Sequence, residues 1–160
     1  MPEEPLAVVP AGPGDAPDVI RLIGRVFDEY GFVWDPGAEV PDLLAFERHY
    51  AAPRGGFWVV RDGAALVGSV GVERLDATTA ELHRLYLDAG LRGQGLGRAL
   101  VDAVLAWCRR EAIGRLVLWS DTRFDRAHAL YERMGFVRTG QRTLPGDVNN
   151  TVEFRYERDV

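Results

Sequence analysis

The stretch from Leu82 to Leu105 constrains the fold of this 160-residue chain more than any other. It begins with apolar residues typical of a strand, crosses a short turn, and passes through Arg92-Gly93-Gln94-Gly95-Leu96-Gly97 into a helix. Glycines let the main chain approach a ligand closely. The first N–H groups of a helix lack partners within the helix and carry the positive end of its dipole. The stretch therefore predicts an anion site, to which Arg92 would add a planar charge suited to phosphate.

The spacing of these glycines excludes two nucleotide-binding motifs. They follow the pattern G-x-G-x-G, whereas the dinucleotide fingerprint is G-x-G-x-x-G. A Walker A loop would continue with Gly-Lys-Ser or Gly-Lys-Thr, and no such sequence follows here. The expected anion therefore belongs to another class of ligand.

The loop resembles the acyl-CoA pyrophosphate loop of the GCN5-related N-acetyltransferase (GNAT) family, written Arg/Gln-x-x-Gly-x-Gly/Ala. Arg92, Gly95 and Gly97 fill its fixed positions. A second segment, Ala127–Phe136, matches the A-x-x-L-Y-x-x-x-G-F signature of that family. Two signatures in the right order are much more specific than either alone. The resemblance covers Phe57 to Phe136 well and the two ends of the chain loosely.

The fold class implied by this resemblance is α/β (α+β), with a mixed, mostly antiparallel central sheet and helices on both faces. We expect one acetyltransferase domain over residues 1–160. Hydrophobic periodicity and turn residues predict the elements in the order strand, two helices, three strands, helix, strand, helix and two strands. Their expected ranges are 6–9, 15–30, 40–50, 57–60, 66–75, 81–87, 97–111, 116–119, 126–134, 136–142 and 152–157.

Composition narrows the possible partners. Hydrophobic residues make up 47 % of the chain and charged residues 27 %, which is the ordinary globular range. The formal net charge of −5 argues against nucleic acid and suits a cationic substrate. With Cys108 as the only cysteine, we expect no disulfide and no metal site. No apolar run is long enough for a membrane span and no signal peptide is evident, so a cytoplasmic location is the default. All nineteen basic residues are arginine, which hints at a GC-rich bacterial genome.

The reaction implied by the resemblance is direct transfer of an acetyl group from acetyl-CoA to a primary amine in a ternary complex. A lysine-like amine of pKa ~10.4 is only ~0.04 % neutral at pH 7, a barrier of ~4.6 kcal/mol, so a base is useful. Glu81 is the first candidate, because histone-type relatives carry a catalytic glutamate at this strand position. Strand alternation places it with His83 on one face and Leu82 with Arg84 on the other. His83 and Glu73 are alternative bases, and Glu81 could instead be a solvated charge or pair with Arg84.

Other roles follow from the resemblance as well. Main-chain groups of Leu85, Tyr86 and Leu87 would lie along the acyl and pantetheine arm and stabilise the oxyanion. Tyr131 occupies the general-acid position, where it would protonate the leaving thiolate; otherwise it is a core aromatic. The pyrophosphate would be held by the loop residues Arg92, Gly93, Gln94, Gly95, Leu96, Gly97 and Arg98. Phe124 stands where many relatives have an asparagine that bonds the pantetheine arm, and Ser120 or Asp121 could replace it.

The acceptor is not named by the sequence. Phe27, Tyr30, Phe32 and Trp34 cluster near acidic residues and would suit an amine on an apolar body, although Phe27 and Tyr30 also lie on the core stripe of their helix. Trp119 could line the same cleft. We expect a small-molecule acceptor. The alternatives are a protein amine, a longer acyl group, or a non-catalytic acyl-CoA-binding or regulatory module. The sequence leaves open whether the protein forms a homodimer.

Overall fold

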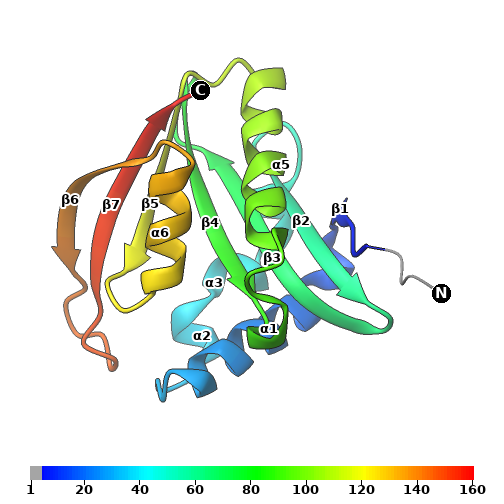
Figure 1. The fold of residues 1–160 in the computed structure, drawn as a ribbon, viewed down its shortest axis with the longest axis vertical. Helices are drawn as coiled ribbons and strands as arrows, with labels where there is room; N and C mark the ends of the chain where they lie inside the picture. Colours follow the sequence, from blue (N-terminus) through cyan, green and yellow to red (C-terminus); the bar gives the residue numbers. More distant parts are fainter. Residues whose placement is uncertain (1–4) are drawn as a thin grey trace.

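The computed structural model describes residues 5–160, which form one seven-stranded sheet in the order β1-β2-β3-β4-β5-β7-β6 (Figure 1). All neighbouring strands are antiparallel except β4 and β5. The predicted fold class is thus confirmed. The elements are β1 (Val8–Pro10), η1 (Pro13–Asp15), α1 (Ala16–Glu29), α2 (Pro36–Glu39), α3 (Pro41–Leu44), α4 (Phe46–Tyr50), β2 (Gly55–Asp62), β3 (Ala65–Arg74), β4 (Thr79–Leu87), η2 (Ala89–Leu91), α5 (Leu96–Arg110), β5 (Arg115–Asp121), α6 (Asp125–Arg133), β6 (Val137–Thr143) and β7 (Val152–Asp159).

Each face of the sheet carries its own hydrophobic core. On one face, α5 and α6 bury residues such as Leu100, Val104 and Tyr131 against the central strands. On the other face, α1, α3 and α4 bury Leu22 and Tyr50 against β2 and β3. The helices therefore cover both faces, as the amphipathic patterns predict. Within residues 5–160, no helix is long and apolar enough to cross a membrane.

The predicted helix over residues 40–50 is wrong in one respect, because two short helices, α3 and α4, replace it, and a third, α2, precedes them. Val40 has φ −130° and ψ 49°, outside the helical region, and Pro41 follows it. The ring of a proline disfavours the helical conformation of the residue before it, so a continuous helix cannot run through this point. Ala45 makes a second break with φ −123° and ψ 46°. The resulting corners carry Asp42 and Tyr50 over the end of the sheet.

The alternation predicted along β4 is also wrong beyond His83. Arg84 has a positive φ of 55° and the register against β3 shifts between Ser69 and Gly71. These are the marks of a β-bulge, which places an extra residue in one strand. The Ser69 hydroxyl donates to the Arg84 carbonyl at 2.8 Å and so satisfies the disrupted ladder. Arg84 therefore shares a face with His83 and bonds to Asp42, instead of pointing away with Leu82.

Strands β4 and β5 are paired over a short distance only, and this opens the sheet. Their register runs from Thr79 opposite Arg115 to Glu81 opposite Val117 and ends there. From Leu82 onward, the described partner of β4 is β3 alone. Figure 1 shows the two strands diverging toward the end at which α1 and α2 lie. One edge of β4 is thus available to a ligand in the middle of the sheet.

Candidate active site

The loop before α5 presents a row of main-chain amides with no acceptor among the described residues, 5–160. Within residues 5–160, no amide from Gly93 to Arg98 donates to a main-chain carbonyl, and the first that does is Ala99, to Gly95 at 3.0 Å. Gly95 caps the helix in the left-handed conformation, with φ 83°, which only glycine adopts without strain. Free amides at the positive end of a fifteen-residue helix are the groups that a phosphate requires.

Arg92 has partners within the protein that the sequence did not reveal. Its guanidinium donates to the Leu87 carbonyl, through Nε at 3.2 Å and Nη2 at 3.0 Å, and Nη1 pairs with Glu29 of α1. The hydrogen bond to Glu29 raises the pKa of Arg92 further above its ordinary value. The side chain therefore ties the loop to β4 and α1, and part of its charge is already neutralised by a carboxylate. A phosphate at this loop would meet the amides first.

A first cavity of 520 Å³ lies between this loop, the end of β4 and the start of α6. Among the residues predicted to bind the coenzyme, Gln94 and Leu96 do not line it: the Leu96 side chain is in the core and Gln94 Nε2 donates to the Gly90 carbonyl at 3.5 Å. The lining is Val26, Tyr30, Leu85, Tyr86, Leu87, Arg92, Gly93, Gly95, Gly97, Arg98, Phe124, Arg126, Ala127, Ala129, Leu130 and Arg133.

Two arginines at the first cavity, Arg126 and Arg133, supply positive charge that sequence reasoning missed. Arg126 and Arg133 lie on α6, and neither makes an ion pair or side-chain hydrogen bond within the described residues. Arg98 on α5 lies 4.0 Å from Asp102. The spacing of seven between Arg126 and Arg133 places both on one side of a helix. That spacing was the signal in the sequence by which the two arginines could have been found. It points to a second group of contacts for an anionic ligand beyond the loop.

A second cavity of 380 Å³ lies where β4 and β5 diverge, and it shares Leu85, Tyr86 and Phe124 with the first. It contains Tyr131, Glu81 and both alternative bases. The full lining is Phe27, Phe32, Glu39, Asp42, His49, Glu73, Glu81, Leu82, His83, Arg84, Leu85, Tyr86, Trp119, Ser120, Asp121, Phe124, Tyr131, Arg142, Leu144, Asn149, Thr151 and Glu153. The two cavities thus meet at the open edge of β4.

Tyr131 is buried, and its hydroxyl is free of protein partners. The side chain is 3 % exposed, and its ring packs on Phe136 and Tyr156 at centroid distances of 5.6 and 5.7 Å. No hydrogen bond to its hydroxyl is present within residues 5–160, and the residue lines the second cavity. Burial raises the pKa of Tyr131 well above its ordinary value. The phenol therefore stays protonated, with its hydrogen available to a group in the cavity.

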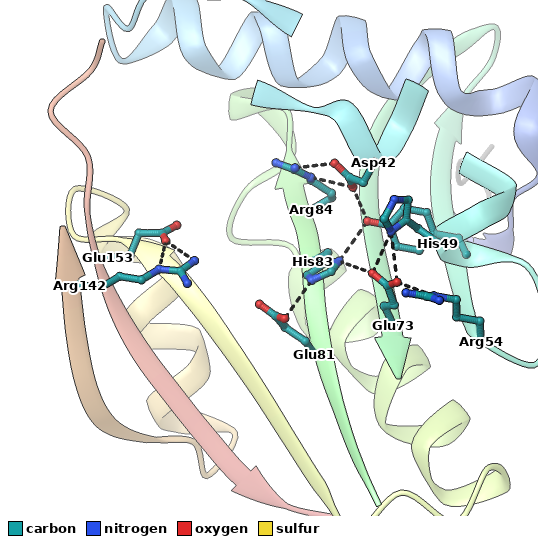
Figure 2. A network of polar contacts seen from close by, with 10 residues as sticks. Asp42, His49, Arg54, Glu73, Glu81, His83, Arg84, Arg142 and Glu153 are labelled. Atoms are coloured by element: carbon teal, nitrogen blue, oxygen red, sulfur yellow. Dashed lines mark hydrogen bonds and ion pairs between the residues drawn. The ribbon is translucent and has the colours of Figure 1, made fainter. Parts of the chain in front are cut away.

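The three candidate bases lie together on the face of β3 and β4 that Figure 2 shows. The Glu81 carboxylate is 3.4 Å from His83 Nε2. Glu73, 7 % exposed, is held by Arg54 Nε at 2.6 Å and by His49 Nδ1 at 3.1 Å. Glu73 is thus committed to two partners, whereas Glu81 and His83 face the cavity as a pair. The alternative pair of Glu81 with Arg84 does not occur among the ion pairs of residues 5–160.

The aromatic residues that were predicted to contact the acceptor do not lie together in the structure. Phe27, Phe32 and Trp119 line the second cavity, whereas Tyr30 lines the first. Trp34 lines neither and packs on Phe27, with ring centroids 4.8 Å apart. Arg142, which sequence reasoning missed, stacks on Trp119 at 4.1 Å and pairs with Glu153 at 2.7 Å. No pattern in the sequence around Arg142 marks it as a site residue, because only the folded chain brings β6 beside the cavity.

Neither Ser120 nor Asp121 stands in for the missing asparagine beside the first cavity. Both line the second cavity instead. The Ser120 hydroxyl is 3.1 Å from His128 Nε2, and the Asp121 carboxylate binds Arg123 at 2.7 Å. Phe124 itself lies between the cavities and stacks edge-on against Tyr30 and Tyr86. Within residues 5–160, no group of histidine, cysteine and acidic side chains is arranged to hold a metal ion.

The amino-acid sequence is similar to several N-acetyltransferases. It is 32 % identical over 127 residues to the uncharacterized N-acetyltransferase YjgM of Escherichia coli, covering 76 % of each chain. It is 34 % identical over 118 residues to the N-alpha-acetyltransferase RimI of Mycobacterium tuberculosis, covering 72 % of this chain and 73 % of that one. Against the N-acetylaspartate synthetase of Danio rerio, identity is 34 % over 117 residues, but only 42 % of that longer protein is covered.

The fold is shared with solved acetyltransferases. A GNAT-family acetyltransferase of Staphylococcus aureus superposes with a TM-score of 0.83 at 24 % identity, covering 97 % of this chain and 99 % of that one. An acetyltransferase of Streptococcus agalactiae gives 0.82 at 22 % identity, with coverage of 97 % and 98 %. The family model "Acetyltransferase (GNAT) family" matches residues 23–136, which include the loop and Tyr131. The chain therefore belongs to the acetyltransferase (GNAT) family and is an acyltransferase.

Proposed function

We propose that this protein is an acetyl-CoA-dependent N-acetyltransferase that moves an acetyl group directly to the primary amine of a small molecule. The observation that carries the proposal is the meeting of two cavities at Leu85, Tyr86 and Phe124. One cavity has free amides and arginines suited to the phosphates of CoA. The other has a carboxylate–histidine pair and a protonated tyrosine. Donor and acceptor would approach each other at the open edge of β4, as a ternary complex needs.

Each step of the transfer has a residue in place. Glu81, with His83 beside it, would take the proton from the acceptor amine. The unpaired edge of β4 from Leu85 to Leu87 would offer main-chain amides to the thioester oxygen as it gains charge. Tyr131, kept protonated by burial, would donate its hydrogen to the departing thiolate. The chain supplies an acid, a base and an oxyanion site around one cavity.

The joined loops beside the second cavity favour a small acceptor. Asn149, in the connection between β6 and β7, accepts a hydrogen bond from the Val33 amide at 2.7 Å and donates to the Val33 carbonyl at 3.0 Å. This reciprocal pair joins two loops beside the cavity, and Arg123 stacks on Phe32 at 4.0 Å next to it. A cytoplasmic location, a bacterial source and a homodimer stay predictions.

The direct test is release of free CoA thiol from acetyl-CoA over a panel of acceptors. The panel contains amino acids, polyamines, aminoglycosides and peptides with a free N-terminus, the last because RimI is an N-alpha-acetyltransferase. Turnover on a small amine supports the proposal, and turnover on peptides alone would move the acceptor to a protein amine. Tight binding of acetyl-CoA without turnover on any amine would instead indicate an acyl-CoA-binding or regulatory module.

Substituting Gly95 is expected to weaken acetyl-CoA binding. Gly95→Ala leaves the space free, since no protein atom lies within 4 Å of the added Cβ, but its φ of 83° is strained for alanine. Holding that conformation costs about 1–2 kcal/mol, so the dissociation constant of acetyl-CoA should rise roughly 5- to 30-fold. Isothermal titration with acetyl-CoA measures the change.

Gly90→Ala is the matched control for this substitution. Gly90 lies in η2 of the same turn, has no positive φ, and would likewise place an added Cβ with no atom within 4 Å. We expect its affinity for acetyl-CoA to match that of the unaltered protein. Equal affinities for the Gly95 and Gly90 variants would show that the loop conformation does not determine coenzyme binding.

A further inference from the structure

We propose that Asp42 and Tyr50 are positioning residues that hold His83 in one tautomer, with its Nε2 lone pair turned toward Glu81 and the acceptor amine. This inference rests on the proposed function, because it assigns a role to residues of the same cavity. The relay joins α3, α4 and β4, and Figure 2 shows Asp42 and His83 connected through the side chain between them. Asp42 and Tyr50 both lie far from His83 in the sequence.

The direction of each hydrogen bond follows from the groups present. Asp42 is bound by Arg84 Nη2 at 2.6 Å and Nε at 3.1 Å. Burial opposes ionisation of Asp42, but the hydrogen bonds from Arg84 outweigh it and hold the pKa of the carboxyl below its ordinary value. Asp42 is therefore an acceptor only. The Tyr50 hydroxyl must donate its single hydrogen to this carboxylate.

The tautomer of His83 then follows. The Tyr50 oxygen lies 3.1 Å from His83 Nδ1. Burial raises the pKa of Tyr50, and Asp42 raises it further, so the phenol is not ionised and its hydrogen is already given to Asp42. The Tyr50 oxygen can only accept from the ring, which places a hydrogen on Nδ1. In the neutral ring the lone pair is on Nε2, 3.4 Å from the Glu81 carboxylate.

Space for this relay is made by Gly71. In the β3–β4 register Gly71 lies directly opposite His83. A Cβ at Gly71 would come within 2.9 Å of Tyr50 Cε1 and 2.7 Å of Phe57 Cδ2. A glycine inside a strand is often explained by such a close approach. Here it lets the Tyr50 ring lie over β3, where its hydroxyl reaches His83.

Two carboxylates lie near the His83 ring. The Glu73 carboxylate lies 4.0 Å from His83 Nδ1, and it is itself anchored by Arg54 and His49. Glu81 lies at the opposite ring nitrogen. The ring thus has a carboxylate near each of its nitrogens.

The proton transfer balances on these atoms. One N–H bond of the acceptor ammonium breaks, and its electron pair stays on nitrogen as the lone pair that attacks the thioester. The proton moves to the Glu81–His83 pair, where it is shared between Glu81 Oε2 and His83 Nε2. With Nδ1 already occupied by hydrogen, Nε2 is the ring nitrogen that can receive it. The other tautomer, with its hydrogen on Nε2, would present an N–H to Glu81. Its Nε2 could not accept the proton from the amine.

The test combines kinetics with NMR of the histidine rings. Long-range ¹H–¹⁵N spectra of the whole protein, at a pH where the ring is neutral, report which nitrogen carries the hydrogen; His83→Gln identifies its signals. In the unaltered protein we expect His83 to be protonated at Nδ1. In Tyr50→Phe we expect a shift toward the Nε2–H form and a roughly tenfold or larger fall in kcat, with the KM of the acceptor within twofold.

Tyr156→Phe is the matched control, because Tyr156 is also a buried tyrosine whose hydroxyl has a protein partner, Arg138. It should leave kcat and the His83 tautomer unchanged. The inference is overturned by a wild-type ring protonated at Nε2, by a Tyr50→Phe kcat equal to that of the control, or by a fall in kcat without a tautomer change. The wild-type spectrum, assigned with His83→Gln, does not need turnover. Absence of turnover on every amine would therefore refute the proposed function separately.

Discussion

Glu81→Gln is expected to lower kcat/KM for the acceptor amine by about 10²- to 10⁴-fold at neutral pH, the range for loss of a general base. Glutamine has nearly the same size and keeps a polar group 3.4 Å from His83, but it cannot take a proton. The affinity for acetyl-CoA should stay the same, since Glu81 lines the second cavity and not the first. Steady-state kinetics with the best amine of the panel measure the fall in kcat/KM, and isothermal titration measures the affinity.

The pH dependence separates a lost base from a misfolded site. The neutral fraction of a free amine rises tenfold per pH unit below its pKa of ~10.4, so the Glu81→Gln variant should recover steadily as the pH is raised. Glu47→Gln is the control, because Glu47 is an exposed glutamate of α4 that lines neither cavity. Equal pH profiles for Glu81→Gln and Glu47→Gln would assign proton removal to another group.

Tyr131→Phe is expected to reduce kcat by on the order of 10²-fold, with a much smaller change in the KM for acetyl-CoA. Phenylalanine preserves the packing on Phe136 and Tyr156, and the lost hydroxyl has no hydrogen-bond partner in residues 5–160. Folding stability should therefore change little, which a thermal melt checks. The deficit reflects a thiolate leaving without a donor, for which water is a poor substitute in a buried site.

The same Tyr156→Phe variant serves as a control for this substitution. It removes a hydroxyl from the ring that packs on Tyr131 and leaves the ring in place. If Tyr131→Phe retained the kcat of the unaltered enzyme, solvent would be the acid and Tyr131 would be a core residue of α6. A rise in KM with kcat unchanged would instead indicate that the hydroxyl only binds the coenzyme.

Local sequence was sufficient for the features whose parts are contiguous in the chain. The glycines of the loop, the strand before it and the helix after it lie within one stretch, so the free amides from Gly93 to Arg98 could be predicted from helix geometry alone. Tyr131 was singled out by the resemblance of ten consecutive residues to a family signature, and its role as the acid stays a prediction. The order of elements also followed from periodicity, apart from the region after Val40, where Pro41 interrupts the helix.

The acceptor side depends on contacts between distant segments, and there the sequence was insufficient. Period-two alternation predicted the direction of Glu81 and His83, but the bulge at Arg84 is set by pairing with β3 and reversed the direction of the residues after it. Arg92 carries a charge suited to phosphate, yet Glu29 of α1, distant in sequence, shares that charge in the folded chain.

The stretch from Leu82 to Leu105 thus predicted an anion site and, with the signature at Tyr131, the family to which the chain belongs, because amides, glycines and helix dipole are local properties of the main chain. The tertiary structure alone decided where β4 and β5 part, and that Asp42, Tyr50 and His83 form one relay. These depend on the register of strands and on the corners between α2, α3 and α4, which place side chains from separate elements within hydrogen-bond distance. Which ring nitrogen of His83 carries the hydrogen is therefore a property of the fold and not of any motif.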